Sequence, residues 1–203
     1  FDLDGTLVQY EQGFGAILDS VFEAELDTAT EAMSAAYNEG FFDAFEDCEP
    51  EPYHAGMRAA LDAEGIEATD GEIDALVAAL RDAEFGATTV PPVVHDCLSE
   101  LADDEATAVV VLTDGVGDWQ RAKVDHHDLG QYLDDTVVSY DVGGHKTNGA
   151  PYAVVRDRID AEEYVMVGDS YESDVEAARE AGFVPIHYED SEVDLFETFT
   201  AML

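Results

Sequence analysis

The sequence predicts an α/β fold, in which a parallel sheet with flanking helices is interrupted by an all-helical module. Apolar residues recur at helical spacing from Gln12 to about Thr88, whereas short apolar runs alternate with helical segments from residue 108 onward. Acidic residues also stand at the ends of several apolar runs. Strands that alternate with helices are typical of parallel sheets, whose polar sites gather at the carboxyl ends of the strands.

The opening residues FDLDGT predict the end of a strand followed by a turn at Gly5-Thr6. Side chains two residues apart in an extended segment point to one face, so Asp2 and Asp4 bring two carboxylates together. Like charges this close destabilise each other unless a cation lies between them. A central strand normally has more apolar residues before such a turn, and we therefore expect the full protein to begin upstream of Phe1.

The inserted module is predicted to be a helical domain of residues 11–88, within an α/β domain formed by residues 1–10 and 89–203. Four helices are expected in it. Thr28 with Glu31, and Thr69 with Glu72, fit the capping box that begins a helix. Pro91-Pro92 ends the module, and a short helix is expected to follow it.

Buried strands are predicted in the second half of the chain at residues 108–113, 136–140, 164–169 and 183–187. Helices are predicted at about residues 118–127, 150–158, 172–181 and from 192 to the end. This order places the strand ends of the α/β domain along one edge.

The chain carries 48 acidic and 8 basic residues, a net charge of −40. Such a surface repels itself at low salt and makes nucleic acid and anionic membranes poor partners. We interpret it as a halophilic adaptation, because molar salt shortens the screening length to about 3 Å. An acidic face that recruits a basic partner is the alternative, although the acids are spread along the whole chain.

This interpretation predicts that enzymatic activity rises with salt concentration, since screening lets the chain stay compact and lets anionic substrates approach. Activity assayed from dilute buffer to molar salt tests it. Highest activity in dilute buffer would contradict the halophilic interpretation.

The two cysteines, Cys48 and Cys97, are distant and form no CxxC pair, so we interpret both as buried thiols of a reduced, cytoplasmic protein. The sequence contains neither an apolar run of about 20 residues nor a signal segment. The oligomeric state cannot be inferred from it.

Polar residues follow the apolar runs at three places. The first group is Asp2 and Asp4, the second is Thr113-Asp114-Gly115, and the third is Asp169 with Asp174. Lys146 precedes the helix that leads to the last of these strands. Oxygen ligands of this kind suit Mg²⁺, which usually keeps waters and a phosphate oxygen as well.

The order DLDGT, apolar run with TDG, lysine, and GDSxxxD resembles the four motifs of the haloacid dehalogenase superfamily, in its branch with a helical cap inserted after the first motif. The resemblance covers essentially the whole chain. It implies a Rossmann-like parallel sheet core, an inserted helical cap that closes over the site and selects the substrate, and Mg²⁺ as cofactor. Two departures stand out: Asp114 where many relatives have asparagine, and no proline directly after Lys146.

Carried over position by position, the resemblance implies that Asp2 is the nucleophile and Asp4 the general acid and base. The phosphoryl group would be bound by Thr113, the following residues Asp114 and Gly115, and Lys146. Asp114 would have a supporting role. The magnesium ligands would be Asp2, Asp169, the main-chain carbonyl of Asp4 and, directly or through another group, Asp174.

The resemblance therefore predicts a magnesium-dependent phosphatase that hydrolyses a small phosphorylated metabolite through an aspartyl-phosphate. Dehalogenases of the superfamily lack the second motif-one carboxylate, so Asp4 favours phosphate esters over carbon–halogen bonds. A sugar phosphomutase and a catalytically idle binding protein with the same fold are the alternatives. Phosphate release against isomer formation would separate the first two.

Overall fold

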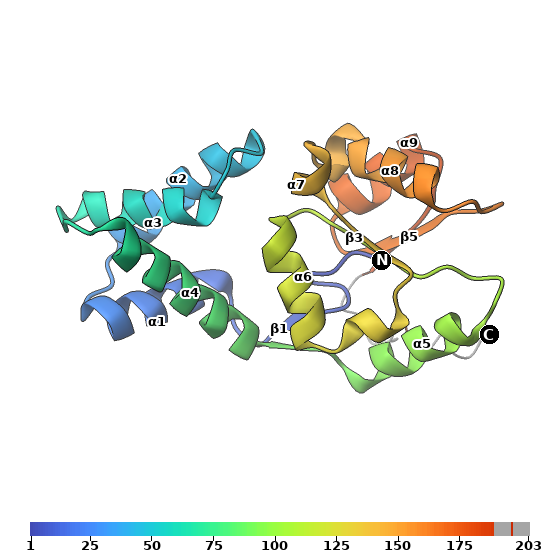
Figure 1. Cartoon of the computed structure of the whole chain (residues 1–203), viewed down its shortest axis with the longest axis horizontal. Coiled ribbons are helices and arrows are strands. Elements are labelled where there is room, and N and C mark those ends of the chain that lie inside the picture. Colours follow the sequence, from blue (N-terminus) through green and yellow to red (C-terminus); the bar gives the residue numbers. More distant parts are fainter. Residues whose placement is uncertain (189–195, 197–203) are drawn as a thin grey trace. The chain divides into compact units, whose positions relative to one another are not determined.

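The computed structural model describes residues 1–188 and 196 (Figure 1). The chain divides into two compact units: residues 1–10 with 89–203, and residues 11–88. We call them the α/β unit and the helical unit. The predicted α/β fold with an inserted helical module is confirmed.

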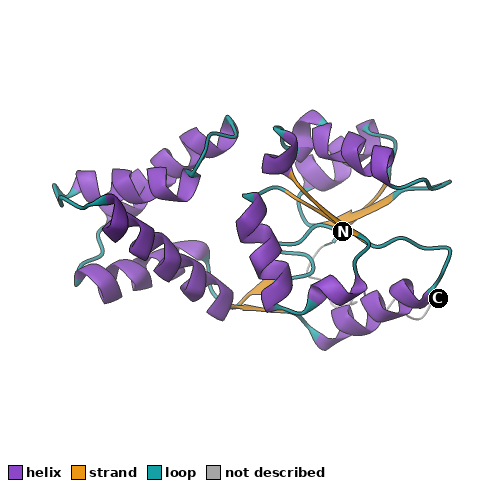
Figure 2. Ribbon diagram, viewed as in Figure 1, coloured by secondary structure: helices purple, strands orange, loops and turns teal. Residues whose placement is uncertain are grey.

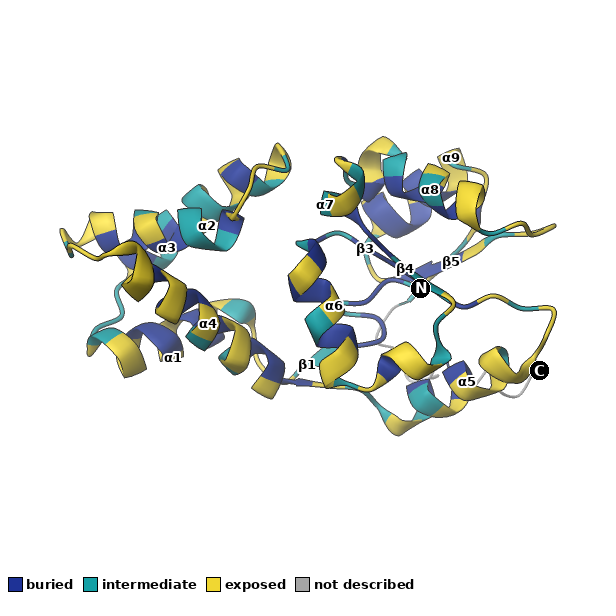
Figure 3. Cartoon of the chain, in the orientation of Figure 1, coloured by how far each residue is buried: buried dark blue, intermediate teal, exposed yellow. Residues whose placement is uncertain are grey.

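The helical unit contains the four predicted helices, which each bury one face and expose the other (Figure 3). Its buried side chains recur at intervals of three and four residues, as an amphipathic helix requires. Ile17, Leu18, Val21 and Phe22 form this stripe on the first helix. The helices are α1 (Phe14–Leu26), α2 (Glu31–Glu46), α3 (Pro52–Ala63) and α4 (Asp70–Gly86).

Of the two predicted capping boxes, the one at Thr69 and Glu72 is confirmed and begins α4. The one at Thr28 is wrong. Helix α2 begins at Glu31 with Thr30 as its N-cap, whose hydroxyl accepts a hydrogen bond from the Met33 amide at 3.2 Å. The N-cap must directly precede the first helical residue, and Thr28 lies too far from it.

The sheet of the α/β unit is parallel, as predicted. Strand β3 (Val110–Thr113) pairs with β4 (Asp135–Val138), and β5 (Val165–Gly168) pairs with β6 (Val184–His187). The first residues connect the two pairs. The Phe1 nitrogen donates to the Val110 carbonyl and the Asp2 amide to the Val167 carbonyl, both at 2.8 Å. Asp2 therefore reaches the carboxyl edge from between β3 and β5.

Helices cover both faces of this sheet (Figure 2). Neighbouring residues of β3 point to opposite faces: Val111 packs with Val94 and Val124 from α5 (Pro92–Asp103) and α6 (Gly117–His126). Leu112 packs into a second cluster with residues of α8 (Ala150–Arg158) and α9 (Ala177–Glu180). The unit is thus a three-layer α/β/α sandwich built around apolar strands.

The remaining elements are short. Strands β1 (Gln9–Tyr10) and β2 (Thr88–Thr89) pair with each other. Helix α7 spans Ser139–Val142, the 3-10 helices span Leu129–Tyr132 and Lys146–Asn148, and a π-helix spans Tyr171–Glu176.

Several boundaries differ from the predictions. The strand predicted at residues 136–140 ends at Val138, because the Ser139 hydroxyl accepts a hydrogen bond from the Gly115 amide at 3.0 Å and the chain turns into α7. The helix predicted at residues 172–181 is split into the π-helix and α9. The helix predicted from residue 192 to the end lies outside the described residues, apart from residue 196.

Burial also departs from the predictions at a few positions. Val165 and Val184 are 44% and 48% exposed, so β5 and β6 are not buried along their whole length. Cys97 is buried as predicted, but Cys48 is partly exposed. Among the described residues, no helix combines the length and hydrophobicity needed to cross a bilayer.

Candidate active site

The predicted site residues that follow the strands meet at the carboxyl edge of the sheet in the α/β unit. Asp2 arrives between β3 and β5, Thr113 ends β3, and Asp169 directly follows β5. Asp174 lies in the π-helix and Lys146 begins a 3-10 helix. Parallel strands explain this convergence, because all their carboxyl ends lie at the same edge.

Lys146 lies at the centre of the group. Its Nζ donates to Asp2 Oδ1 at 2.7 Å and to Asp174 Oδ1 at 2.6 Å. The side chains of all three residues are almost completely buried. One ammonium group is thus shared by two buried carboxylates, although no proline follows Lys146.

The π-helix determines the position of Asp174. Ser170 begins it as an N-cap, and the Ser170 amide donates to Asp174 Oδ2 at 3.0 Å. A side chain at Gly168 would overlap the Asp174 carboxyl group. The glycine of GDS is thus required for close approach of this carboxylate, and π-helical turns are frequent at functional sites.

Three carboxylates form a candidate cation site. Asp2, Asp169 and Asp174 each offer an oxygen within 4.8 Å of the other two. Gly5, at φ +85°, brings the first turn so close that an added Cβ would lie 2.5 Å from Asp169 Oδ2. Hard oxygen donors of this kind suit Mg²⁺. The donor set therefore fits the metal that the sequence predicts.

Electrostatics also favour a cation here. Burial raises the pKa of Asp2, and although Lys146 lowers it, Asp174 raises it further, so that it reaches about 7. Burial and the Asp174 charge likewise raise the pKa of Asp169. Burial by itself lowers the pKa of Lys146, but Asp2 and Asp174 raise it well above its ordinary value. Negative charge in the cluster exceeds what one lysine compensates.

We predict that Mg²⁺ stabilises the protein more at about pH 8 than at about pH 5. The raised pKa of Asp2 means that the folded state binds more protons than the unfolded state between about pH 4 and pH 7. The contribution of Asp2 to the free energy of unfolding therefore falls as the pH rises through this range, and Mg²⁺ binds the deprotonated carboxylates.

Thermal unfolding in molar NaCl, with and without Mg²⁺ at the two pH values, measures the effect. The variant Asp2→Asn serves as control and should flatten the pH dependence. An equal shift of the unfolding temperature at both pH values would contradict the prediction.

Asp4 lies in a second polar group that sequence reasoning missed. Its Oδ1 accepts from Lys123 Nζ at 2.5 Å and from the Tyr10 hydroxyl at 2.9 Å. Its Oδ2 accepts from Gln120 Nε2 at 2.7 Å. Burial raises the pKa of Asp4, but Lys123 and these hydrogen bonds outweigh burial and hold it below its ordinary value.

In the sequence only Lys146 stands near the position where the resemblance implies a lysine, so the sequence predicts no role for Lys123. A signal was nevertheless present. Gln120 and Lys123 are three residues apart on the helix after TDG, and such residues share a helix face. In the structure both are buried, which is unusual for these residue types.

The residues of the TDG motif have different surroundings. Thr113 Oγ1 accepts from Gln120 Nε2 at 2.8 Å. Asp114 Oδ1 accepts from the Lys146 amide at 2.9 Å and so contacts the loop that carries the lysine. The Gly115 amide donates to Ser139 Oγ, so it is already used and we leave it out of the phosphate contacts proposed below.

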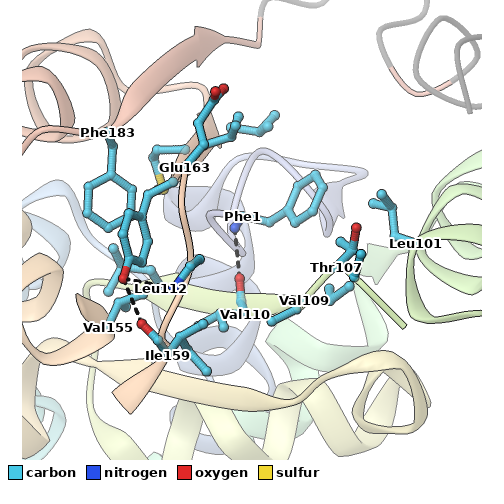
Figure 4. Close-up of a pocket in the computed structure, with 17 residues that line it drawn as sticks. Phe1, Leu101, Thr107, Val109, Val110, Leu112, Val155, Ile159, Glu163 and Phe183 are labelled. Carbon is cyan, nitrogen blue, oxygen red and sulfur yellow. Dashed lines mark hydrogen bonds between the residues drawn. The ribbon is translucent and has the colours of Figure 1, made fainter. Parts of the chain in front are cut away.

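A cavity of about 300 Å³ lies elsewhere in the α/β unit (Figure 4). It is lined mainly by apolar side chains around Phe1, among them Val110, Leu112 and Phe183. It includes none of the acids or lysines described above. The polar edge of the sheet, and not this cavity, is the candidate active site.

Comparison with solved structures shows the same fold. YfnB from Bacillus subtilis, a protein assigned as a HAD-hydrolase and bound to magnesium, is 23% identical, with a TM-score of 0.73 over 98% of this chain and 96% of that chain. A protein from Thermotoga maritima assigned as a beta-phosphoglucomutase is 20% identical, with a TM-score of 0.70 over 98% and 89%. L-2-haloacid dehalogenase from Xanthobacter autotrophicus is 16% identical, with a TM-score of 0.65 over 100% and 86%.

No curated protein matches the chain significantly in sequence. The family model of the haloacid dehalogenase-like hydrolases, in contrast, matches residues 1–182. This match spans both units and every site residue described above. The chain therefore belongs to the haloacid dehalogenase-like hydrolase family.

Proposed function

We propose that the protein is a magnesium-dependent phosphatase that hydrolyses a small phosphorylated metabolite through an aspartyl-phosphate. One observation carries the proposal: Asp2, Asp169 and Asp174 offer oxygens within 4.8 Å of one another, beside Lys146. The second carboxylate, Asp4, supports phosphate-ester chemistry over carbon–halogen cleavage. Asp2 belongs to this carboxylate cluster and also accepts a hydrogen bond from Lys146.

In the first step an oxygen of Asp2 attacks phosphorus and forms the aspartyl–phosphate bond. The bond from phosphorus to the ester oxygen breaks, and Asp4 gives its proton to the leaving oxygen. Asp4 must carry this proton although its pKa lies below its ordinary value, because Lys123 and the hydrogen bonds outweigh burial. Thr113 and Lys146 hold phosphoryl oxygens, which fixes the group for in-line attack.

In the second step Asp4, now a carboxylate, takes a proton from water. The water oxygen attacks phosphorus, the bond to Asp2 breaks, and inorganic phosphate leaves. Asp2 is restored as a carboxylate and Asp4 carries the proton that the next cycle needs. The two carboxylates thus divide the work between nucleophile and proton transfer.

The metal would be held by Asp2, Asp169, the main-chain carbonyl of Asp4 and Asp174. When bound, Mg²⁺ neutralises charge on the phosphoryl oxygens. It would also compensate the negative charge of the carboxylates around Lys146.

The proposed partner is a small phosphorylated substrate. The helical unit carries few cations, Arg58 and Arg81, so a second highly anionic substrate group is disfavoured. The net charge of −40 argues against nucleic acid and anionic membranes as partners. We propose that the protein is located in the cytoplasm.

The proposal is tested by phosphate release from para-nitrophenyl phosphate in molar NaCl, with Mg²⁺ and with a chelator. Magnesium-dependent release is expected. A folded protein that releases no phosphate from this ester or from a panel of phosphorylated metabolites would overturn the proposal. Conversion of a sugar phosphate to its isomer without phosphate release would instead support the mutase.

A further inference from the structure

The carboxylate of Asp4 accepts hydrogen bonds from side chains of the α/β unit, of which Lys123 and Gln120 are buried. The Lys123 side chain is 1% exposed, whereas that of Asp4 is 29% exposed. Both carboxylate oxygens are engaged: Oδ1 by Lys123 and Tyr10, and Oδ2 by Gln120. Each carboxylate oxygen has about two acceptor positions, so Oδ2, which accepts only from Gln120 among these donors, keeps capacity for a proton.

Gln120 connects this carboxylate to the neighbouring motif. The same Nε2 donates to Asp4 Oδ2 at 2.7 Å and to Thr113 Oγ1 at 2.8 Å. Room for the amide depends on Gly115, where an added Cβ would lie 2.6 Å from Gln120 Cγ. The group proposed to protonate the leaving oxygen is thereby kept at a fixed spacing from a group proposed to hold the phosphoryl oxygens.

Stability alone is a weak reason for such an arrangement. A buried ion pair commonly contributes no more than well-packed apolar side chains, because both charges lose their hydration. Proton transfer, in contrast, requires the acid within hydrogen-bond reach of one particular oxygen. The side chain of an aspartate at the edge of a sheet has two free torsions unless neighbouring groups fix them. Lys123, Gln120 and Tyr10 hold both carboxylate oxygens of Asp4.

We infer that Lys123 and Gln120 are positioning residues that hold Asp4 in the orientation for proton transfer to the leaving oxygen and from water. The inference rests on the proposed phosphatase function. It assigns the buried lysine of α6 a role distinct from that of Lys146, which contacts Asp2 and Asp174 instead.

Leaving-group dependence tests this role. Phenyl phosphate and para-nitrophenyl phosphate are similar in shape, but phenolate is a much poorer leaving group than para-nitrophenolate. Cleavage of phenyl phosphate therefore depends more on the proton that Asp4 is proposed to donate. The variants are Lys123→Met, Gln120→Met and, as a benchmark for loss of the proton donor, Asp4→Asn. Arg121→Met is the matched control, since it removes a charge from the exposed side of the same helix. The quantity compared is kcat/KM, which covers the steps through release of the phenol.

Lys123→Met should lower kcat/KM for phenyl phosphate by roughly 10²-fold, within the range that general acid catalysis contributes, and by at least about tenfold less for para-nitrophenyl phosphate. Gln120→Met should show the same selectivity to a smaller extent, and Arg121→Met should change neither substrate. Gln120→Met removes no charge and provides the test if Lys123→Met does not fold, which circular dichroism in molar salt will show.

The positioning role would be overturned if folded Lys123→Met and Gln120→Met lost equal kcat/KM on both esters while Asp4→Asn lost more on phenyl phosphate. The phosphatase proposal would then remain intact. A wild-type protein that hydrolyses neither ester nor any phosphorylated metabolite would overturn both. Restoration of the phenyl phosphate activity of Lys123→Ala by ethylammonium would further support the role, because a small amine can replace the missing ammonium group.

Discussion

Asp2→Asn is expected to lower phosphate release by at least about 10⁴-fold while the protein stays folded. Asparagine has nearly the same shape as aspartate but lacks the charged oxygen that is proposed to attack phosphorus. Loss of a covalent nucleophile has costs of this order or larger. The side chain would still fit beside Lys146, because an amide oxygen can accept the hydrogen bond now made at 2.7 Å.

The measurement is single-turnover and steady-state hydrolysis of para-nitrophenyl phosphate in molar salt with Mg²⁺. Asp157→Asn, on the exposed side of α8, makes the same chemical change away from the site and should leave the rate unchanged. Mass spectrometry of the rapidly quenched enzyme should detect a phosphorylated Asp2 in the wild type alone. Undiminished turnover by Asp2→Asn would exclude it as the nucleophile.

Lys146→Met is expected to lower the free energy of unfolding by about 3–5 kcal/mol in magnesium-free buffer. The substitution keeps the length of the side chain but leaves the buried carboxylates of Asp2 and Asp174 without their shared cation, and breaking a buried pair from one side has costs in this range. High salt should not remove the effect, since buried charges are screened much less than exposed ones.

Denaturant unfolding in molar salt measures this loss, and Arg58→Met is the matched control. Arg58 pairs with Asp70 at 3.0 Å, but both side chains are substantially exposed, so its loss should cost less than about 1 kcal/mol. Mg²⁺ should restore part of the stability of Lys146→Met by supplying positive charge to the same carboxylates. If both variants lost equal stability, the buried cluster would not have the importance proposed for it.

The sequence alone determined the fold class and the positions of the acids. Apolar periodicity is a local property, and it correctly separated the four helices of residues 11–88 from the alternating strands and helices that follow. Acids directly after apolar runs are expected at the ends of strands, and the parallel arrangement of the strands brings Asp2 and Asp169 to one edge. The π-helix after β5 adds Asp174 to them.

The sequence predicted the ends of some elements inaccurately, because a single hydrogen bond decides where they end or begin. Apolar texture continues from Thr136 to Tyr140, but the bond from the Gly115 amide to Ser139 ends the strand early. Thr28 and Thr30 are equally plausible caps by residue type, and only the backbone geometry at Glu31 selects Thr30.

Only the tertiary structure decided which lysine serves which carboxylate. Lys146 reaches Asp2 over a separation of 144 residues, and Lys123 reaches Asp4 over 119. No local pattern contains such pairings, because they depend on how the helices pack against the sheet. The sequence therefore identified the acids of the site, whereas the groups that neutralise and orient those acids became apparent only from the folded chain.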